Sequence, residues 1–428
     1  MVIVKLYNFI LTKLYNGYII YLESEVKAME RIEKHVINKN HPMYEACDLL
    51  CFQSKNMYNL CNYTIRQTFI KEGVVKRYGD LNKELKHTDA FKELGSNSAQ
   101  MVTKILCKNW KSFLVAVSDY TKHPDKYFAK PKIPKYLKKD GRFVCTLTNW
   151  QTQIHDGYLY FAFKRLKPFN NMFRTKVTGY HLSTRIVPKG GCYVLEIVYR
   201  KEPIQLNLDR NRIVSIDLGV NNFVTMVNNI GKHPIVINGK GIKSYNQYWN
   251  KEISKYRSIA KKTNNLDWTK RLQRLTNKRN FKLDYFMHCA SKYVIDYCIN
   301  NNIGTVVIGK NDKWKQECTM SKLNNQNFIQ IPYEQFIKKL QYKAEEVGID
   351  VIVNEEGYTS GTSFLDNELP IKENYNKERR IHRGLFISND GTKINADVNA
   401  AYQIMKKVFS NAMNEIVGVH LHPVIINL

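Results

Sequence analysis

The sequence predicts a multidomain α/β protein in which a small β-barrel is interrupted by a block of helices and followed by a larger α/β domain. Three observations lead to this prediction. Apolar residues recur at helical spacing over residues 46–120, short β-rich runs punctuated by Pro and Gly fill residues 121–205, and strand-like and helix-like stretches alternate over residues 206–428. With 428 residues, 43% of them hydrophobic, the chain is long enough to bury more than one core.

The N-terminal 28 residues are treated as an extension of uncertain status. They are apolar enough to resemble a membrane anchor or a signal, but Lys5 and Lys13 interrupt the run and no small-residue cleavage site follows. Residues 29–37, MERIEKHVI, are predicted to form the first strand. This strand would pair with those after the helical block, so that residues 29–45 and 121–205 together make the barrel.

The helical block and the returning strands differ in the period of their apolar residues. Leu50, Met57, Cys61 and Ile65 are spaced as on one helix face, and residues 46–120 are therefore predicted to be all helical with a basic exposed face. The runs FVCTLT, GYLYFAF, YHLSTRIV and CYVLEIVYR are rich in β-branched and aromatic residues and predict antiparallel strands.

The C-terminal half reads as strands alternating with helices. RIVSIDLGVNNFVTMV and HPIVING predict a strand pair, and two long amphipathic helices follow. IGTVVIG, PYEQFIKKLQYKAEEVG and IDVIVNEE then predict a strand, a helix and a strand, before a last helix from Asn399. This alternation favours an α/β sheet over residues 206–428.

The charge of the chain predicts a polyanionic partner. Lysine and arginine number 66 against 38 acidic residues, a formal charge of +28 and a pI near 9.6. Nucleic acid is the usual polyanion that neutralises such an excess, although a generally basic surface without a partner is the alternative. In residues 121–142, TKHPDKYFAKPKIPKYLKKDGR, lysines alternate with aromatic residues, which favours a strip that follows a nucleic-acid backbone and stacks bases.

The nine cysteines are scattered and include no C-x-x-C pair. A disulfide framework or a four-ligand zinc site is therefore not expected, and the reducing cytoplasm is the expected compartment, with nucleoid association if the host is a bacterium.

Two aspartates stand where a metal-dependent nuclease would need them. Asp217 lies inside the apolar run IVSIDLGV, where an unpaired carboxylate is costly, and capping of the following turn is the alternative role. Asp397, in KINADVNAAYQI, precedes a helix and could simply be its N-cap. As a pair within a basic α/β domain, they suit two Mg²⁺ ions that activate water for phosphodiester cleavage.

SIDLGVNNFVTMV and ADVNAAYQI resemble the first and third RuvC motifs of the TnpB (OrfB-type) transposon-encoded RNA-guided endonucleases, which are related to Fanzor proteins and to type V CRISPR effectors. The resemblance implies a wedge-type barrel with a helical recognition insertion and then a RuvC domain of RNase H-like fold. It also implies a guide RNA from the transposon end, double-stranded target DNA, a short target-adjacent motif and Mg²⁺.

The sequence departs from most of this family in two places. Gly309 stands at the strand end where the second RuvC acid is expected, and YTSGTSFLDNELP replaces a C-x-x-C zinc ribbon, so no zinc is expected. IDVIVNEEGYTS resembles the family subset whose catalytic glutamate has moved to E-x-x-T-S. This resemblance assigns the third acid to Glu356, with Glu355 in reserve and a solvated acidic turn as the alternative.

The resulting prediction is a Mg²⁺-dependent, RNA-guided DNA endonuclease in which Asp217, Glu356 and Asp397 hold the metal. The predicted nucleic-acid contacts are Lys130, Lys132, Lys135, Lys138, Lys139, Arg142, Lys310, Lys315, Arg380 and Arg383. Two alternatives stay open: an RNA-guided regulator with an inactive site, and a transposase that acts without RNA. No membrane partner is expected, and the oligomeric state is left open.

Overall fold

The computed structural model describes residues 14–15, 18–19, 28–311, 321–382, 384–410 and 418–428. The chain divides into two compact units, Met1–Glu202 and Pro203–Leu428, each with its own core. The sequence analysis predicts the boundary between the two units after residue 205, three residues later than the structure has it. Ile204 and Leu206 donate backbone hydrogen bonds to Glu346 and Val347, which ties the connecting segment to the second unit. Apart from Ala28 and the paired two-residue strands β1 (Leu14–Tyr15) and β2 (Tyr18–Ile19), the predicted extension lies outside the described residues.

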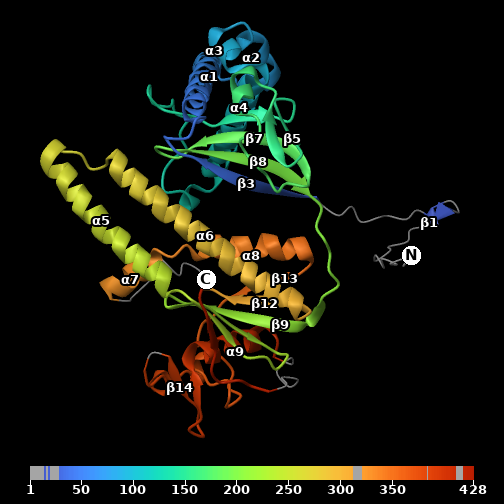
Figure 1. The fold of residues 1–428 in the computed structure, drawn as a ribbon, viewed down its shortest axis with the longest axis vertical. Helices are drawn as coiled ribbons and strands as arrows, with labels where there is room; N and C mark the ends of the chain where they lie inside the picture. The colour runs from blue at the N-terminus through green and yellow to red at the C-terminus, as the bar shows by residue number, and fades with distance from the viewer. Residues whose placement is uncertain (1–13, 16–17, 20–27, 312–320, 383, 411–417) are drawn as a thin grey trace. The chain divides into compact units, whose positions relative to one another are not determined.

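The first unit combines helices with antiparallel sheets (Figure 1). A four-stranded sheet has the order β3 (Met29–Ile37), β8 (Tyr193–Lys201), β7 (Tyr180–Pro188), β4 (Cys145–Thr148). A separate hairpin pairs β5 (Thr152–His155) with β6 (Tyr158–Phe161). The strand before the helices thus pairs with a strand after them, as the sequence predicts, while closure of these strands into a barrel stays a prediction.

Between β3 and β4 the chain is helical. The helices are α1 (Tyr44–Glu72), α2 (Tyr78–Leu85), α3 (Asp89–Leu94) and α4 (Ser96–Lys122). Their apolar residues at intervals of three and four face one core, in which Trp110 is fully buried and donates its indole N–H to Asn62 Oδ1 at 3.0 Å. Two short 3-10 helices, Pro124–Lys126 and Lys164–Phe169, complete the unit.

The second unit is built on a six-stranded mixed sheet. Its strand order is β13 (Asp350–Asn354), β12 (Ile303–Gly309), β9 (Asp209–Leu218), β10 (Asn222–Asn228), β11 (Ile235–Asn238), β16 (Val424–Ile426). β9, β10 and β11 form an antiparallel meander, whereas β12 runs parallel to β9 and β13 runs parallel to β12. The carboxyl ends of β9, β12 and β13 therefore meet at one edge of the sheet.

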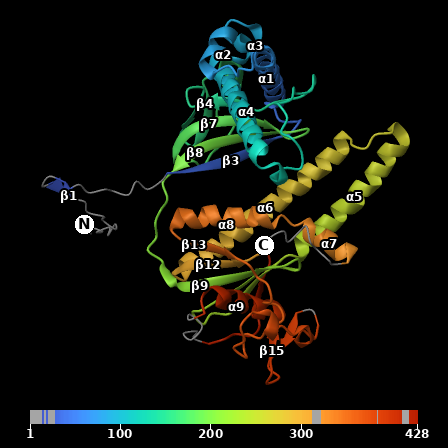
Figure 2. The same ribbon diagram turned by 180° about the vertical axis from the view of Figure 1, so that it is seen from behind.

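Helices cover both faces of this sheet. On one face lie α6 (Lys270–Asn300) and α8 (Tyr333–Val347), and on the other lies α9 (Ala396–Val408), as Figure 2 shows. Val306 and Ile308 pack toward the first pair while Val307 packs toward α9, which explains why the β12 run is apolar without alternation. α5 (Lys240–Asn264) packs beside α6, and α7 (Lys322–Ile329) precedes α8.

The last part of the chain leads into α9. A short hairpin of β14 (Leu385–Ile387) and β15 (Lys393–Asn395) follows two 3-10 turns at Lys372–Asn374 and Lys377–Arg379. α9 begins at Ala396, three residues earlier than the sequence predicts, because the Asn395 side chain accepts hydrogen bonds from the N–H groups of Asp397 and Val398. The mixed α/β fold is thus confirmed. Among the helices described, none has both the length and the apolar character needed to cross a membrane.

Candidate active site

The first two positions of the candidate site lie side by side on neighbouring parallel strands. Asp217 is near the end of β9, and Gly309 ends β12. The register pairs Ile216 with Ile308, so Asp217 and Gly309 are each one residue further along and about 5 Å apart. A side chain at position 309 would therefore stand beside the Asp217 carboxylate, but glycine supplies none.

Glu356 reaches the same strand end from β13. Gly309 pairs with Asn354, the last residue of β13, and Glu356 follows two residues later. The Glu356 backbone N–H donates to Asn311 Oδ1 at 3.1 Å, and its carbonyl accepts the Thr359 hydroxyl at 2.8 Å. The threonine of the E-x-x-T-S pattern thus closes the turn that carries the glutamate.

The absence of a side chain at Gly309 makes room for the Glu356 carboxylate. A Cβ atom built on Gly309 would lie 2.8 Å from Glu356 Oε2 and 2.4 Å from Ile404 Cδ1, both far inside ordinary van der Waals contact. Ile404 is buried on α9 and closes this space from the opposite side. The glycine at position 309 and the glutamate at position 356 therefore complement each other in space.

Asp397 enters from the first turn of α9. Because Asn395 already caps this helix, the Asp397 carboxylate is not used as the N-cap. Its Oδ2 accepts the Asn222 side-chain amide at 2.7 Å, and its Oδ1 accepts Arg380 Nη2 at 3.2 Å. Asn222 belongs to the LGVNN turn after β9, so the two aspartate motifs are joined by a direct side-chain contact.

Electrostatics connect the three acids. Burial raises the pKa of Asp217 well above its usual range, and the negative charges of Asp397 and Glu356 raise it further, against the opposing effect of Arg380. Burial and then the charge of Glu355 raise the pKa of Glu356 to about 7. The carboxylates of Asp217, Glu356 and Asp397 are therefore close together, and the nearby cations compensate only part of their negative charge.

The donor set suits a hard divalent cation. Glu356 Oε2 is buried without a hydrogen-bond partner, and carboxylate oxygens are the ligands that Mg²⁺ prefers. A cation would offset the charges that raise the pKa of Asp217. Across the described ranges, no three acidic, histidine or cysteine side chains already form a closed ligand shell. The residues therefore fit the chemistry of a divalent ion without showing a finished metal geometry.

Glu355, the reserve candidate, points elsewhere. It is exposed and forms an ion pair with Lys407 on α9, and that contact lowers its pKa. Its Oε1 also accepts the Gly357 N–H at 2.5 Å. Of the two adjacent glutamates, only Glu356 is directed toward Gly309.

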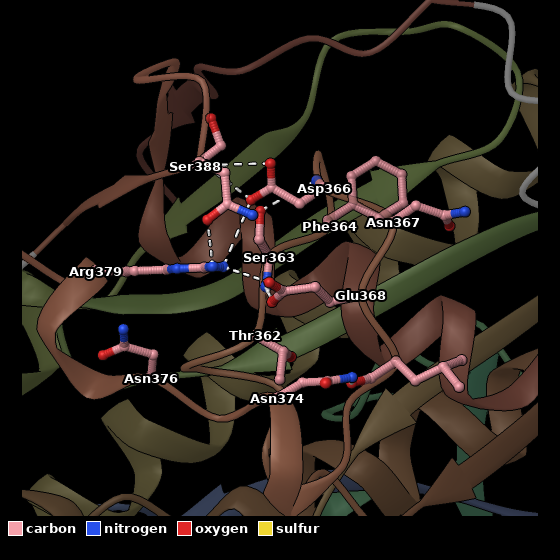
Figure 3. A network of polar contacts seen from close by, with 12 residues as sticks. Thr362, Ser363, Phe364, Asp366, Asn367, Glu368, Asn374, Asn376, Arg379 and Ser388 are labelled. Atoms are coloured by element: carbon pink, nitrogen blue, oxygen red, sulfur yellow. Dashed lines mark hydrogen bonds and ion pairs between the residues drawn. The ribbon is translucent and has the colours of Figure 1, made fainter.

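An ion-pair network organises the segment between Glu356 and α9 (Figure 3). Arg379 Nη1 lies 2.7 Å from Glu368 Oε1 and 3.5 Å from Asp366 Oδ2, and all three side chains are mostly buried. Arg379 also donates to Asn389, whose N–H donates in turn to Asp366 at 3.0 Å. The network fixes the residue before Arg380.

Side chains of α9 also hydrogen-bond the segment between Glu356 and α9. The buried Asn399 side chain donates to the Thr362 carbonyl at 2.8 Å and accepts the Phe364 N–H at 2.9 Å. Lys406 donates to the Asn367 carbonyl at 2.6 Å. The asparagine of the ADVN motif, Asn399, therefore links α9, which carries Asp397, to the loop that follows Glu356.

The predicted nucleic-acid residues lie in different settings. Lys130, Lys132, Lys135, Lys138 and Lys139 are exposed on an extended segment of the first unit. That segment is tied to α1 by hydrogen bonds from Asn59 and Asn62 to its backbone, which leaves the lysine side chains outward. Arg142, in contrast, forms a two-bond ion pair with Asp48.

In the second unit, two of the predicted contacts are engaged within the protein. Lys310 pairs with Glu334, and Arg380 pairs with Asp397. Lys315 and Arg383 lie outside the described residues.

Sequence reasoning missed several residues that shape the site. Asn222 contacts Asp397, Lys407 pairs with Glu355, and Ile404 bounds the space beside Gly309. The Tyr333 hydroxyl donates to the Gly219 carbonyl at 3.0 Å. Burial raises the pKa of Tyr333, and the charges of Asp217 and Glu356 add to this effect. Asn222 and Ile404 lie within the two RuvC-like motifs, but their contacts join elements far apart in the sequence and could not be read from the motifs.

Two family models match successive parts of the chain, mostly within the second unit. Residues 196–315 match the OrfB_IS605 family model, described as a probable transposase, and residues 333–404 match a Cas12f1-like TNB domain model. The chain is 24% identical over 402 residues to the TnpB-like protein ORF457 of Acidianus two-tailed virus, which covers 85% of this chain and 83% of that protein. It is 30% identical over 222 residues to the CRISPR-associated endodeoxyribonuclease Cas12f1 of Sulfoacidibacillus thermotolerans, which covers 50% of this chain and 49% of that protein.

Solved structures give only a loose likeness. The mini-RNA-guided endonuclease CRISPR-Cas_phi3 matches 93% of this chain and 94% of its own with a TM-score of 0.46 and 10% identity. A Cas12f1–sgRNA–target DNA complex matches 87% of this chain and 98% of its own with a TM-score of 0.36 and 16% identity. At these scores the overlays support no residue-by-residue comparison.

Proposed function

Because the chain belongs to a TnpB-type family related to the type V CRISPR effectors, we propose that it is a transposon-encoded, RNA-guided endonuclease that cuts DNA with the help of Mg²⁺. The observation that supports cleavage most directly is the meeting of Asp217, Glu356 and Asp397 around a space that Gly309 leaves open. The guide RNA would come from the transposon end, and a short motif beside the target would be read by the protein.

The strand order of the second unit supports an RNase H-like nuclease domain over residues 206–428. The strand order is β13-β12-β9-β10-β11. The first three strands run parallel to one another and β10 runs antiparallel to β9, which is the arrangement expected of that fold. It puts the strand that carries the first acid next to the strand that ends at Gly309. A second acid delivered from β13 then reaches the same edge.

Asp217, Glu356 and Asp397 would hold two Mg²⁺ ions. When bound, the ions would activate a water molecule and stabilise the leaving oxygen of the phosphodiester. Asn222 fixes one oxygen of Asp397 and leaves the other to Arg380. Arg380 thereby balances part of the negative charge, and we expect it to contact a phosphate of the bound strand.

An inactive, RNA-guided regulator is the second candidate, and Gly309 is the observation that favours it. Loss of the acid from the end of β12 would by itself remove a metal ligand. The close fit between Gly309 and Glu356 favours relocation of the acid instead, because a decayed site has no need of a carboxylate in that space.

The test is cleavage of a plasmid library with randomised flanks by the protein expressed with its native downstream DNA. Wild type is compared with Glu356→Gln and, as a matched control, with Glu355→Gln. We expect Mg²⁺-dependent cuts beside a fixed short motif, lost in Glu356→Gln and kept in Glu355→Gln. Binding of the target without cutting by the wild type would establish the regulator, and strand transfer of transposon ends by RNA-free protein would establish a transposase.

A further inference from the structure

The helical hairpin of α5 and α6 is the most basic feature of the second unit outside the candidate active site. Between Lys255 and Lys282 the chain has ten lysines and arginines and one carboxylate, Asp267. Figure 1 shows the two helices as a yellow hairpin whose connecting loop lies far from the sheet of its own unit. None of these residues takes part in the site around Asp217.

Three of these cations line one open pocket. Arg271, Arg274 and Lys278, together with Leu275, surround a hollow of about 350 Å³ on the outer face of α6. Their spacing of three, four and seven residues places them in a row on one helix face, about 10 Å long at 1.5 Å per residue. The row is therefore long enough to meet more than one phosphate of an extended strand.

The row is not neutralised by the protein itself. All three side chains are exposed, and the ion pairs of these helices join Lys261 to Asp267 and Lys292 to Asp296. Among the described residues, no carboxylate pairs with Arg271, Arg274 or Lys278. Neighbouring charges of one sign repel one another, so a bound anion would stabilise this face.

Aromatic rings are held at the end of the row. The Arg271 guanidinium lies 3.6 Å from the centre of the Tyr256 ring and donates a hydrogen bond to its hydroxyl. Trp268, which is 42% exposed, donates its indole N–H to Gln273 Oε1 at 2.9 Å, and Arg257 lies 5.9 Å from its ring centre. The Trp268 ring is thus fixed in position while part of it remains open to solvent.

We propose that this hairpin surface, formed by Arg271, Arg274, Lys278 and Trp268, binds a single-stranded segment of the guide RNA. The inference rests on the proposed function, because that function supplies the RNA. The cations would neutralise consecutive phosphates, and Trp268 would stack on an unpaired base. Duplex DNA keeps its bases stacked on one another, whereas proteins read RNA chiefly at unpaired bases that stack on aromatic rings and guanidinium planes.

The experiment compares RNA binding by the full chain and two charge-matched variants. One variant carries Arg271→Gln, Arg274→Gln and Lys278→Gln. The control carries Lys338→Gln, Lys372→Gln and Lys393→Gln, three exposed lysines of the second unit that belong neither to the candidate site nor to the predicted nucleic-acid contacts. Each protein is titrated with the RNA that copurifies with the wild type, at several salt concentrations, and with duplex target DNA in parallel.

We expect the hairpin variant to lose RNA affinity and to reduce the slope of log K against log salt by about 2, since each lost single-strand phosphate contact removes about 0.7. Trp268→Leu should weaken RNA binding about tenfold without changing that slope, because it removes stacking and no charge. The substituted side chains are exposed, so melting temperatures should match the wild type; if the triple variant fails to fold, the three single variants replace it.

Three outcomes would overturn the inference: RNA binding by the hairpin variant equal to wild type, an equal loss in the control, or a selective loss of duplex DNA binding. These outcomes are distinct from failure of the proposed function itself. In that case no discrete RNA would copurify with the wild type at all.

Discussion

Substitution of Gly309 by alanine tests whether the Glu356 carboxylate occupies the space beside β12. The new methyl group would stand 2.8 Å from Glu356 Oε2 and 2.4 Å from Ile404 Cδ1, whereas ordinary contacts begin at 3.4 Å. The carboxylate would therefore have to move by about 0.6 Å, the difference between 3.4 and 2.8 Å, and the isoleucine by about 1 Å. Overpacking of this kind costs about 1–3 kcal/mol of folding free energy.

The expected effect on cleavage is similar in free energy to the effect on stability. A displacement of about 1 Å at a reacting group can lower rates by about 100-fold, so a carboxylate shift of about 0.6 Å should make Gly309→Ala cut target DNA about ten times more slowly. The double variant Gly309→Ala with Ile404→Val removes the Cδ1 atom. It should regain part of the lost stability but not the lost activity, because the contact with Glu356 remains.

The assays are thermal denaturation of the purified protein and single-turnover cleavage of plasmid DNA with saturating guide RNA and Mg²⁺. Wild-type cleavage by Gly309→Ala would refute the reasoning, since a carboxylate used in catalysis could not then lie against this strand. Recovery of activity in the double variant would show instead that Ile404, and not Glu356, transmits the effect.

Three further predictions concern the same region. Glu356→Gln should abolish cleavage but keep target binding. Glu355→Gln removes the exposed charge that pairs with Lys407, keeps a carbonyl oxygen for the Gly357 N–H, and should cleave as the wild type does; gel shifts and cleavage assays separate the two effects. In EDTA the stability that Glu356 contributes should fall as pH rises from about 4.5 to about 7. The pKa of Glu356 is raised to about 7 in the folded chain, so the folded chain binds more protons than the unfolded chain in that window. The urea midpoints of wild type and Glu356→Gln should therefore converge toward low pH, and parallel curves would contradict this. Arg379→Met should destabilise the protein by about 3 kcal/mol, because it leaves the mostly buried Asp366 and Glu368 without their cation, whereas Lys377→Met, at an exposed neighbouring position, should leave the melting temperature unchanged.

Much of the second unit follows from local patterns in the sequence. The apolar run of β12 predicts a strand buried on both faces, and the structure has helices on both sides of it. The alternation of strands and helices predicts an α/β sheet, since such apolar runs can be buried only where helices cover the sheet. The positions of Asp217 and Asp397 within their motifs were also visible, as was the basic charge that predicts nucleic acid.

The order and direction of the strands could not be predicted in the same way. Which strand neighbours which depends on crossovers between distant segments, and the pairing of Gly309 with Asn354 joins residues 45 positions apart. The role of Asp397 was equally ambiguous, because an aspartate in the first turn of a helix suits a cap as well as a metal. The structure assigns the cap to Asn395 and leaves Asp397 to Asn222 and Arg380.

The sequence by itself determined that this is a basic α/β protein with two acidic motifs and an acidic pair at positions 355 and 356. Only the tertiary structure decided which member of that pair faces the first two acids. The two glutamates are chemically identical and adjacent, so no local preference separates them. The turn closed by Thr359 sends one toward the space above Gly309 and the other toward Lys407, because direction after a strand is set by the contacts at its end and not by the residue itself.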